Sequence, residues 1–137
     1  MIVRSFVDTN VLVYADDPRD AVKQARATQL VAEALRTRLG VVSTQVLQEY
    51  FSAATRKLHL NAEIVQAKVK LLASLNVVQV DPSLILAAID LHRLHQLSFW
   101  NALILQAAVA AGCRELLSEH MQPGFRHHGV VIVDPFA

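Results

Sequence analysis

The sequence contains one cysteine and is short of charge. With Cys113 alone, no disulfide forms within the chain. No pattern of basic residues marks Cys113 as an activated thiolate, so we expect a small buried residue. Charged residues make up 18% of the chain, and 13 Lys and Arg against 12 Asp and Glu give a formal charge of +1. This balance lacks the basic excess of many nucleic-acid-binding domains, but it leaves room for a local basic face around an acidic pocket.

Long hydrophobic runs are also missing, although hydrophobic residues make up 53% of the chain. The longest suspect, residues 102–112, is too short to span a bilayer and contains Gln106. The opening residues MIVR lead into an apolar segment without a basic region or cleavage site, so no signal peptide is expected. We therefore expect one domain, residues 1–137, in the cytoplasm and away from membranes. The surplus apolar surface is expected to meet a partner or a second copy.

Short apolar segments alternate with longer helical patterns along the whole chain. The strands are expected at residues 2–7, 41–42, 77–80, 115–117 and 130–133. The helices are expected at residues 11–14, 21–39, 45–58, 82–95 and 99–111, with another that starts after Asn61. The expected helix caps are residues 9–10, residues 43–44, Asn61, Asp81 and Ser98, and Gly40 is expected to end the second helix. This alternation predicts an α/β fold with a mostly parallel sheet covered on both faces.

Polar side chains follow the predicted strands or open the neighbouring helices. In a parallel α/β sheet, ligands bind beyond the carboxyl ends of the strands. The residues at such positions are Asp8, Ser43, Thr44, Glu49, Ser98, Asn101, Ser118, Glu119 and His120. We therefore expect several oxygen donors to converge at one edge of the sheet.

A cluster of carboxylates and carboxamides suits Mg²⁺ or Mn²⁺, which take one or two carboxylates and keep several waters. Each residue also has a plainer interpretation. Asp8 is placed where a helix cap is common, and Glu49 and Glu119 are equally consistent with solvent-facing acids. Asn101, three residues after Ser98, is at a common surface position of a first helical turn.

Other candidate residues carry less weight. His92 and His95 are three residues apart on one helix, but nothing nearby completes a metal site. Residues 127–128, both histidine, indicate a solvated loop. Phe99 and Trp100 favour the core over a role in stacking on bases.

Four segments resemble the motifs of PIN domains, especially the VapC-type toxins of bacterial toxin–antitoxin pairs. They are residues 6–12 (FVDTNVL), 43–51 (STQVLQEYF), 97–104 (LSFWNALI) and the stretch 112–124, which contains LSEHMQ. Residues 131–136 (VIVDPF) resemble the usual last strand and tail. The resemblance implies an α/β/α sandwich and a Mg²⁺- or Mn²⁺-dependent endoribonuclease. It also implies a homodimer and an antitoxin that occludes the site.

The resemblance assigns roles residue by residue. Asp8 and Glu49 match the first two acids of the family's site. Positions that orient the acids or the metal's water are matched by Thr9, Asn10 and Ser118.

Two positions depart from the pattern. The third motif normally carries aspartate where this chain has Asn101, and the fourth usually reads Ser-Glu-Asp where it has His120 at the end. Glu119 is the candidate for the missing fourth role. Three accounts stay open: a poor or inactive nuclease, one that is active with Mn²⁺ through Asp8, Glu49 and Glu119, and an aspartate at 101 replaced by engineering.

Three hypotheses follow from these residues. The first is a metal-dependent ribonuclease, and the second is a degenerate PIN domain that binds RNA or an antitoxin without cutting. A third is a phosphatase or phosphotransferase with Asp8 as nucleophile. Arg56 and Lys57, beyond Glu49, are candidates to contact RNA phosphates. An exposed tail around Phe136 favours a dimer and an antitoxin peptide.

Overall fold

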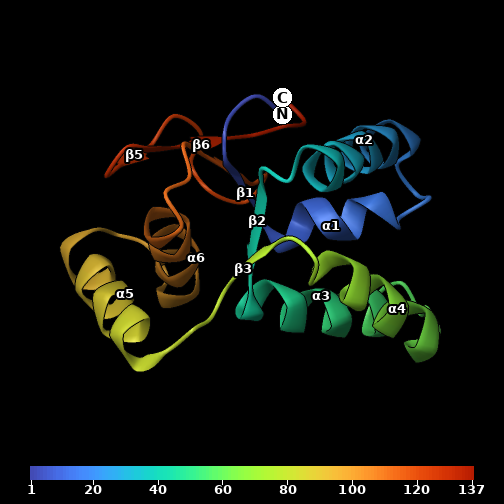
Figure 1. The fold of residues 1–137 in the computed structure, drawn as a ribbon, viewed down its shortest axis with the longest axis horizontal. Coiled ribbons are helices and arrows are strands. Elements are labelled where there is room, and N and C mark those ends of the chain that lie inside the picture. The colour runs from blue at the N-terminus through green and yellow to red at the C-terminus, as the bar shows by residue number, and fades with distance from the viewer.

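A six-stranded sheet organises the computed structural model, which describes residues 1–137 (Figure 1). Its strands are β1 (Ser5–Val7), β2 (Gly40–Ser43), β3 (Asn76–Val78), β4 (Glu115–Leu117), β5 (Arg126–His127) and β6 (Val130–Val133). Their order across the sheet is β3-β2-β1-β4-β6-β5. All neighbours pair in parallel except β5, which is antiparallel to β6. The predicted mostly parallel α/β sheet is confirmed.

Six helices connect the strands. They are α1 (Thr9–Ala15), α2 (Ala21–Thr37), α3 (Thr44–Arg56), α4 (Ala62–Leu72), α5 (Pro82–Leu94) and α6 (Phe99–Ala110). The predicted caps Ser43, Asn61, Asp81 and Ser98 each accept a hydrogen bond from a backbone N–H of the following turn. α1 begins at Thr9, two residues before the predicted start at residue 11, because Asp8 is its cap.

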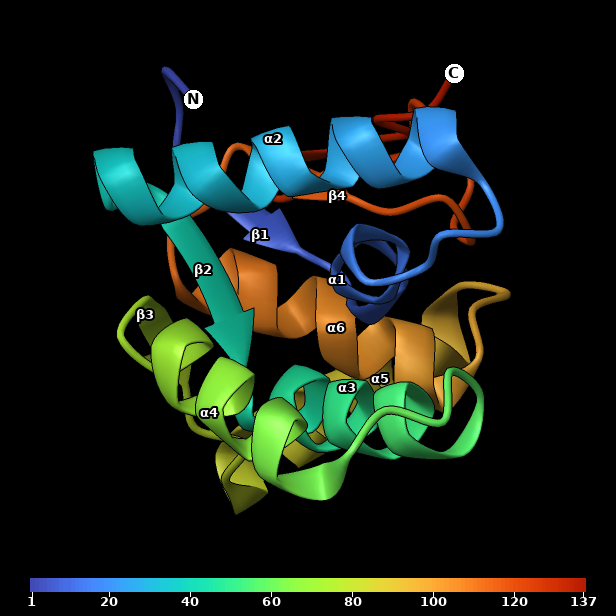
Figure 2. The same ribbon diagram turned by 90° about the vertical axis from the view of Figure 1, so that its right-hand side faces the viewer.

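The helices lie on both faces of the sheet. α2 covers one face and α6 lies on the other, with α5 packed against α6 (Figure 2). The core between these layers contains fully buried side chains such as Phe6, Val41, Leu105 and Leu116. Burying each such side chain contributes about 1.5–3 kcal/mol, which explains why the short strands are mostly apolar. None of the helices combines the length and the apolarity that crossing a membrane requires.

Two turns differ from the sequence predictions. The last residue of α2 is Thr37, two residues before the predicted end, and the following cap Arg38 adopts a left-handed conformation with φ 62°. Gly40, predicted to end this helix, instead begins β2. A Cβ at Gly40 would lie 2.5 Å from the Cβ of Ala34, so glycine is needed where α2 packs against β2. Residues 127–128, predicted as a solvated loop, belong partly to β5. His128 and Gly129 both have positive φ, as the tight turn of a two-residue hairpin requires.

The expected exposed tail is instead folded against the domain. Phe136 is partly buried, and its ring meets that of Tyr14 edge to face with centroids 5.0 Å apart. Its backbone N–H donates to Asp134. Because the tail is anchored in this way, it offers no support for a dimer or for a bound peptide.

Candidate active site

A cavity of about 690 Å³ opens beyond the carboxyl ends of β1 and β2. α1, α3 and the first turn of α6 contribute most of its wall. Eight of the predicted site residues line it, namely Asp8, Thr9, Asn10, Glu49, Arg56, Lys57, Asn101 and His120. The cavity therefore lies at the edge of the sheet where ligand binding was predicted.

Asp8 is held at the bottom of this site by the sheet itself. It directly follows β1, and the parallel register that pairs Val7 with Leu117 brings Ser118 beside it. One carboxylate oxygen, Oδ1, accepts from the Thr9 N–H at 2.7 Å. The other, Oδ2, accepts from Ser118 Oγ at 2.8 Å and from Asn10 Nδ2 at 3.1 Å. Asp8 is thus both a helix cap and a fully supported carboxylate.

Burial raises the pKa of Asp8, while the hydrogen bonds from Ser118, Thr9 and Asn10 and the nearby His120 act against that shift. Only 7% of the residue is exposed, and it forms no ion pair with a basic side chain. A buried carboxylate without a cationic partner is costly. Its environment therefore favours a cation in the cavity.

Glu49 faces the same cavity from α3 and is more exposed than Asp8. Desolvation raises the pKa of Glu49, and the charge of Asp8 raises it further. The Thr9 hydroxyl donates to Glu49 Oε1 at 3.2 Å. Because the Thr9 backbone N–H also donates to Asp8, this one residue joins the two acids.

Asn101 and His120 are held less firmly than Asp8. The Asn101 backbone N–H donates to the Ser98 cap at 3.1 Å, but its carboxamide makes no hydrogen bond within the chain. His120 is exposed, and its backbone N–H donates to Ser118 Oγ at 3.2 Å. Both side chains therefore face the cavity with polar atoms available.

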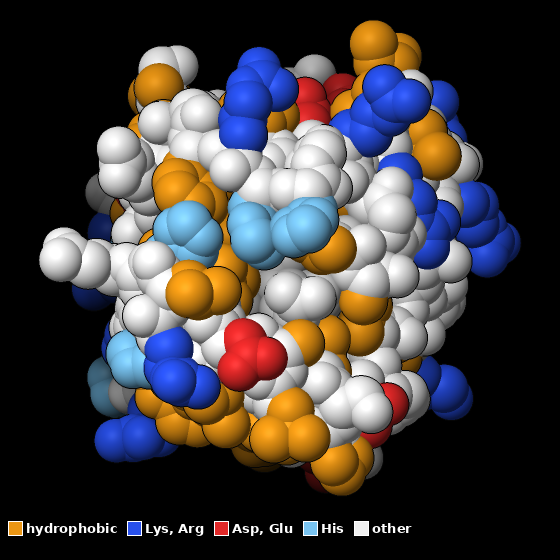
Figure 3. All heavy atoms as spheres, turned by 90° about the vertical axis from the view of Figure 1, so that its left-hand side faces the viewer, with side chains coloured by type: hydrophobic (Ala, Val, Ile, Leu, Met, Phe, Trp, Pro, Cys, Tyr) orange, Lys and Arg blue, Asp and Glu red, His pale blue; other side chains and the backbone are white.

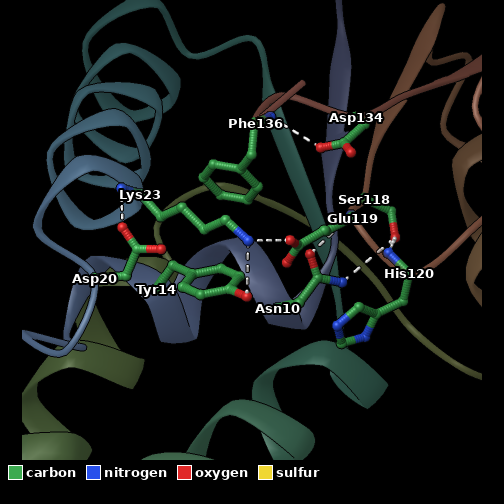
Figure 4. A network of polar contacts seen from close by, with 9 residues as sticks. All are labelled: Asn10, Tyr14, Asp20, Lys23, Ser118, Glu119, His120, Asp134 and Phe136. Atoms are coloured by element: carbon green, nitrogen blue, oxygen red, sulfur yellow. Dashed lines mark hydrogen bonds and ion pairs between the residues drawn. The ribbon is translucent and has the colours of Figure 1, made fainter.

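Glu119 lies apart from the other acids and does not line the cavity. Its carboxylate forms an ion pair with Lys23 of α2 (Figure 4). Burial acts to raise the pKa of Glu119, but Lys23 and Tyr14 hold it below its ordinary value. The same contact raises the pKa of Lys23 to about 12. The fourth metal ligand predicted at Glu119 is not brought to Asp8.

Glu119 nevertheless contacts the site through its backbone. Its N–H donates to Asn10 Oδ1 at 3.0 Å, and the Asn10 amide in turn donates to Asp8. Lys23 also lies over the ring of Tyr14, 4.8 Å from its centroid. A connected set of contacts thus runs from α2 through Glu119 and Asn10 to Asp8.

The donor set fits one hard cation and does not fit a pair of them. No group of three or more His, Cys, Asp or Glu side chains is arranged to hold a metal ion. Asp8 and Glu49 supply two carboxylates, and Asn101 offers an amide oxygen at the same cavity. Mg²⁺ is commonly bound through one or two carboxylates with water in its other positions.

Basic side chains surround the acidic floor. The predicted phosphate contacts Arg56 and Lys57 are exposed and line the cavity. Arg19 lines it too, held by two hydrogen bonds of 2.9 Å to the buried carboxylate of Asp17. The site therefore combines a negative floor with a positive rim, as the near-zero net charge allowed.

Sequence reasoning missed Gln45, Arg19 and Lys23. Gln45 lies four residues before Glu49, and that helical spacing alone places both on one face of α3. Its side chain is buried, and Oε1 has no partner within the chain. Arg19 and Lys23 carry no comparable signal, because their places depend on how α2 and the loop before it pack.

Histidines gather on the face that carries α5 and β5, away from the cavity (Figure 3). The rings of His95 and His127 lie 5.8 Å apart, and those of His127 and His128 lie 4.3 Å apart. Burial, with the charges of His128 and His95, lowers the pKa of His127. The pair His92 and His95 forms no metal site, since the Nδ1 atom of His92 contacts the Leu97 carbonyl.

Comparisons with known proteins agree with this fold. The family model of the PIN domain matches residues 5–119. VapC20 of Mycobacterium tuberculosis, described as a toxin that cleaves the sarcin-ricin loop, is 23% identical with a TM-score of 0.66. The match covers 82% of this chain and 86% of that one. A chain of a toxin–antitoxin complex from Klebsiella pneumoniae is 20% identical with a TM-score of 0.68, over 96% and 97% of the two chains. No curated protein sequence matches.

Proposed function

The chain belongs to the PIN domain family, and we propose that it is the toxin of a toxin–antitoxin pair, an endoribonuclease that depends on Mg²⁺ or Mn²⁺. The observation that carries the proposal is the pairing of Asp8 and Glu49 through Thr9 in one cavity with a basic rim. Two linked carboxylates suit a divalent cation, and basic residues around them suit a polyanion.

We assign the residues of the site separate roles. Asp8 and Glu49 hold the cation, and Asn101 adds an amide oxygen. A divalent cation, when bound, supplies charge that orients the scissile phosphate and lowers the pKa of an attacking water.

The remaining groups position the acids and the substrate. Thr9, Asn10 and Ser118 keep Asp8 in place through the hydrogen bonds described above. Arg56 and Lys57 attract the RNA phosphates at the rim of the cavity.

Three other residues of the site, Asn101, His120 and Glu119, favour a second function, binding without cleavage. Asn101 and His120 occupy the positions where the family pattern has acids, and Glu119 is engaged by Lys23. A PIN domain that binds RNA or an antitoxin without cutting accounts for these replacements. The phosphatase alternative has less support, because the Asn10 amide donates to Asp8 and no second acid stands close behind it.

The proposal includes an antitoxin, a homodimer and a cytoplasmic location. The antitoxin is supported by the fold similarity to the Klebsiella toxin–antitoxin complex. The homodimer is supported by exposed apolar side chains on α5, namely Leu86, Ile89 and Leu94. Light scattering of the purified chain tests the dimer directly.

Cleavage of RNA by the purified chain tests the nuclease. We expect cutting with Mg²⁺ or Mn²⁺ and none after chelation. Asp8→Asn keeps the size of the side chain but removes the charge, so it is expected to slow cleavage by at least about a hundredfold. Asp90→Asn, at an exposed surface acid of α5, is the matched control. If the unmodified chain binds RNA but cuts it with neither metal, the binding function replaces the nuclease.

A further inference from the structure

Trp100 is the large apolar side chain of α6 that is exposed to solvent. The helix buries Ala102, Leu103, Ile104, Leu105, Ala107 and Ala108. Trp100, by contrast, is 62% exposed. The prediction that it joins the core was wrong. Consecutive helix residues point about 100° apart, and the half-buried Phe99 takes the position against the core.

The exposed indole belongs to the wall of the candidate active site. Trp100 lines the same cavity as Asp8, Glu49 and its own neighbour Asn101. The ring of Phe99 meets the indole edge to face, with centroids 5.0 Å apart. Gln45 Nε2 of α3 donates to the backbone carbonyl of Trp100 at 3.4 Å. The indole thus packs against Phe99 on one side, and the backbone that carries it is tied to α3.

We propose that Trp100 stacks on one base of the RNA in the cavity and so selects unpaired nucleotides, an inference that rests on the proposed function. Arg56 and Lys57 at the rim of the same cavity match phosphates, whereas Trp100 matches the flat face of a base. A base within a duplex already stacks on its neighbours, so only an unpaired base is available to an aromatic side chain.

Leaving this indole uncovered is unfavourable, because removing apolar surface from water lowers the free energy. Most of the residues that line the cavity are polar or charged, since only 5 of the 17, Trp100 among them, are hydrophobic. A ligand that covers Trp100 and fills the cavity therefore presents apolar or aromatic surface to the indole and polar or charged groups to the rest of the wall. A nucleotide has both.

The test uses the fact that Trp100 is the only tryptophan in the chain. Its emission is followed while the full chain, kept in chelator so that no RNA is cut, is titrated with three probes. These are a short single-stranded RNA with all four bases, the duplex of the same sequence, and an abasic ribose-phosphate oligomer of equal length. We expect the single strand to quench the emission, and the other two to leave it nearly unchanged.

Variants then measure what the ring contributes, with labelled RNA followed by anisotropy. Trp100→Leu keeps an apolar side chain without a π face and is expected to weaken binding of the single strand about 5- to 150-fold. Trp100→Phe keeps a smaller ring and is expected to lose much less. Ile64→Ala, on α4 and outside the cavity, removes a side chain that is 54% exposed and is expected to change nothing.

The outcomes separate this inference from the proposed function. Equal affinity of Trp100→Leu and the unmodified chain, or equal quenching by the abasic oligomer, overturns stacking, while cleavage still decides the nuclease. Emission that responds to protein concentration but not to RNA assigns Trp100 to a contact between copies and also overturns it. Quenching without cleavage in either metal keeps stacking and refutes the nuclease. Absence of any RNA binding overturns both.

Discussion

Asp8 and Asn101 face the same cavity, but the fold supports them very differently. Asp8 follows a central strand, is nearly buried, and accepts hydrogen bonds from Thr9, Asn10 and Ser118. Asn101 is in the first turn of α6, where its carboxamide makes no hydrogen bond within the chain. One side of the site is therefore fixed before any ligand arrives, whereas the other side is free to adjust.

This difference explains which residue types each side tolerates. A change beside Asp8 leaves a buried carboxylate with fewer donors, and such groups are costly to leave unsatisfied. A change at position 101 meets only the cavity, so asparagine is accepted there without damage to the fold. The replacement of an acid at the third motif therefore bears on metal binding far more than on folding.

Among the substitutions that test this comparison, Asn101→Asp should have the largest effect, because it makes the side of the cavity at position 101 acidic like the side that carries Asp8. A charge pair at ~4 Å and an effective dielectric near 20 is worth roughly 4 kcal/mol, and even half of that strengthens metal binding about thirtyfold. Titration calorimetry with Mn²⁺ and Mg²⁺ measures the affinity, and RNA cleavage should rise with it. The control is Asn10→Asp, which adds the same charge next to Asp8, at the residue whose amide donates a hydrogen bond to that carboxylate. Unchanged metal affinity in Asn101→Asp would show that position 101 does not contact the ion.

Ser118→Ala tests the fixed side. Ser118 is fully buried, and its hydroxyl donates to Asp8 while accepting from the His120 N–H. Without it, buried polar groups lose their partner, so the free energy of unfolding should fall by at least about 1 kcal/mol. Urea unfolding measures this loss. Ser52→Ala, at a half-buried serine that lines the same cavity, should have a much smaller effect. Equal stability of both variants would refute the idea of a rigid Asp8 side.

Lys23→Met tests the contacts that connect α2 to Asp8 through Glu119 and Asn10. Methionine keeps the apolar stem against Tyr14 and Phe136 but removes the charge that pairs with Glu119. We expect a lower melting temperature than for Lys70→Met, an exposed lysine of α4 without an ion pair. We also expect cleavage to slow several-fold, because the Glu119 N–H helps to hold Asn10. If the two lysine variants have the same melting temperature and cleavage rate, the contacts between α2 and Asp8 contribute to neither stability nor cleavage.

The fold was largely predictable because caps and breakers mark most elements. The bounds expected for β4 and β6 agree with the structure, and Ser43, Asn61, Asp81 and Ser98 begin their helices as predicted. The two-residue strand β5 was missed, since a His-Gly turn is not a common hairpin signal. Local chemistry therefore identifies elements well where a side chain satisfies the backbone nearby.

The site was predictable only in part, and the reason is the distance along the chain over which its contacts form. Asp8, Glu49, Asn101 and His120 meet at one cavity because strand ends and helix starts converge there. The engagement of Glu119 joins residues 96 positions apart and depends on how α2 packs, which no local pattern encodes. Whether these side chains bind metal stays a prediction for the experiments above.

Asn101→Ala should have the smallest effect, and it tests the comparison most directly. The Asn101 backbone N–H keeps its bond to the Ser98 cap in the variant, and no hydrogen bond of the side chain is lost. Alanine also favours a helix slightly more than asparagine does. The free energy of unfolding should therefore change by no more than about 0.5 kcal/mol. Urea unfolding beside Ser118→Ala gives the contrast under identical conditions. A loss as large as that of Ser118→Ala would mean that Asn101 is part of the fixed framework, and that both sides of the cavity are built before a ligand binds.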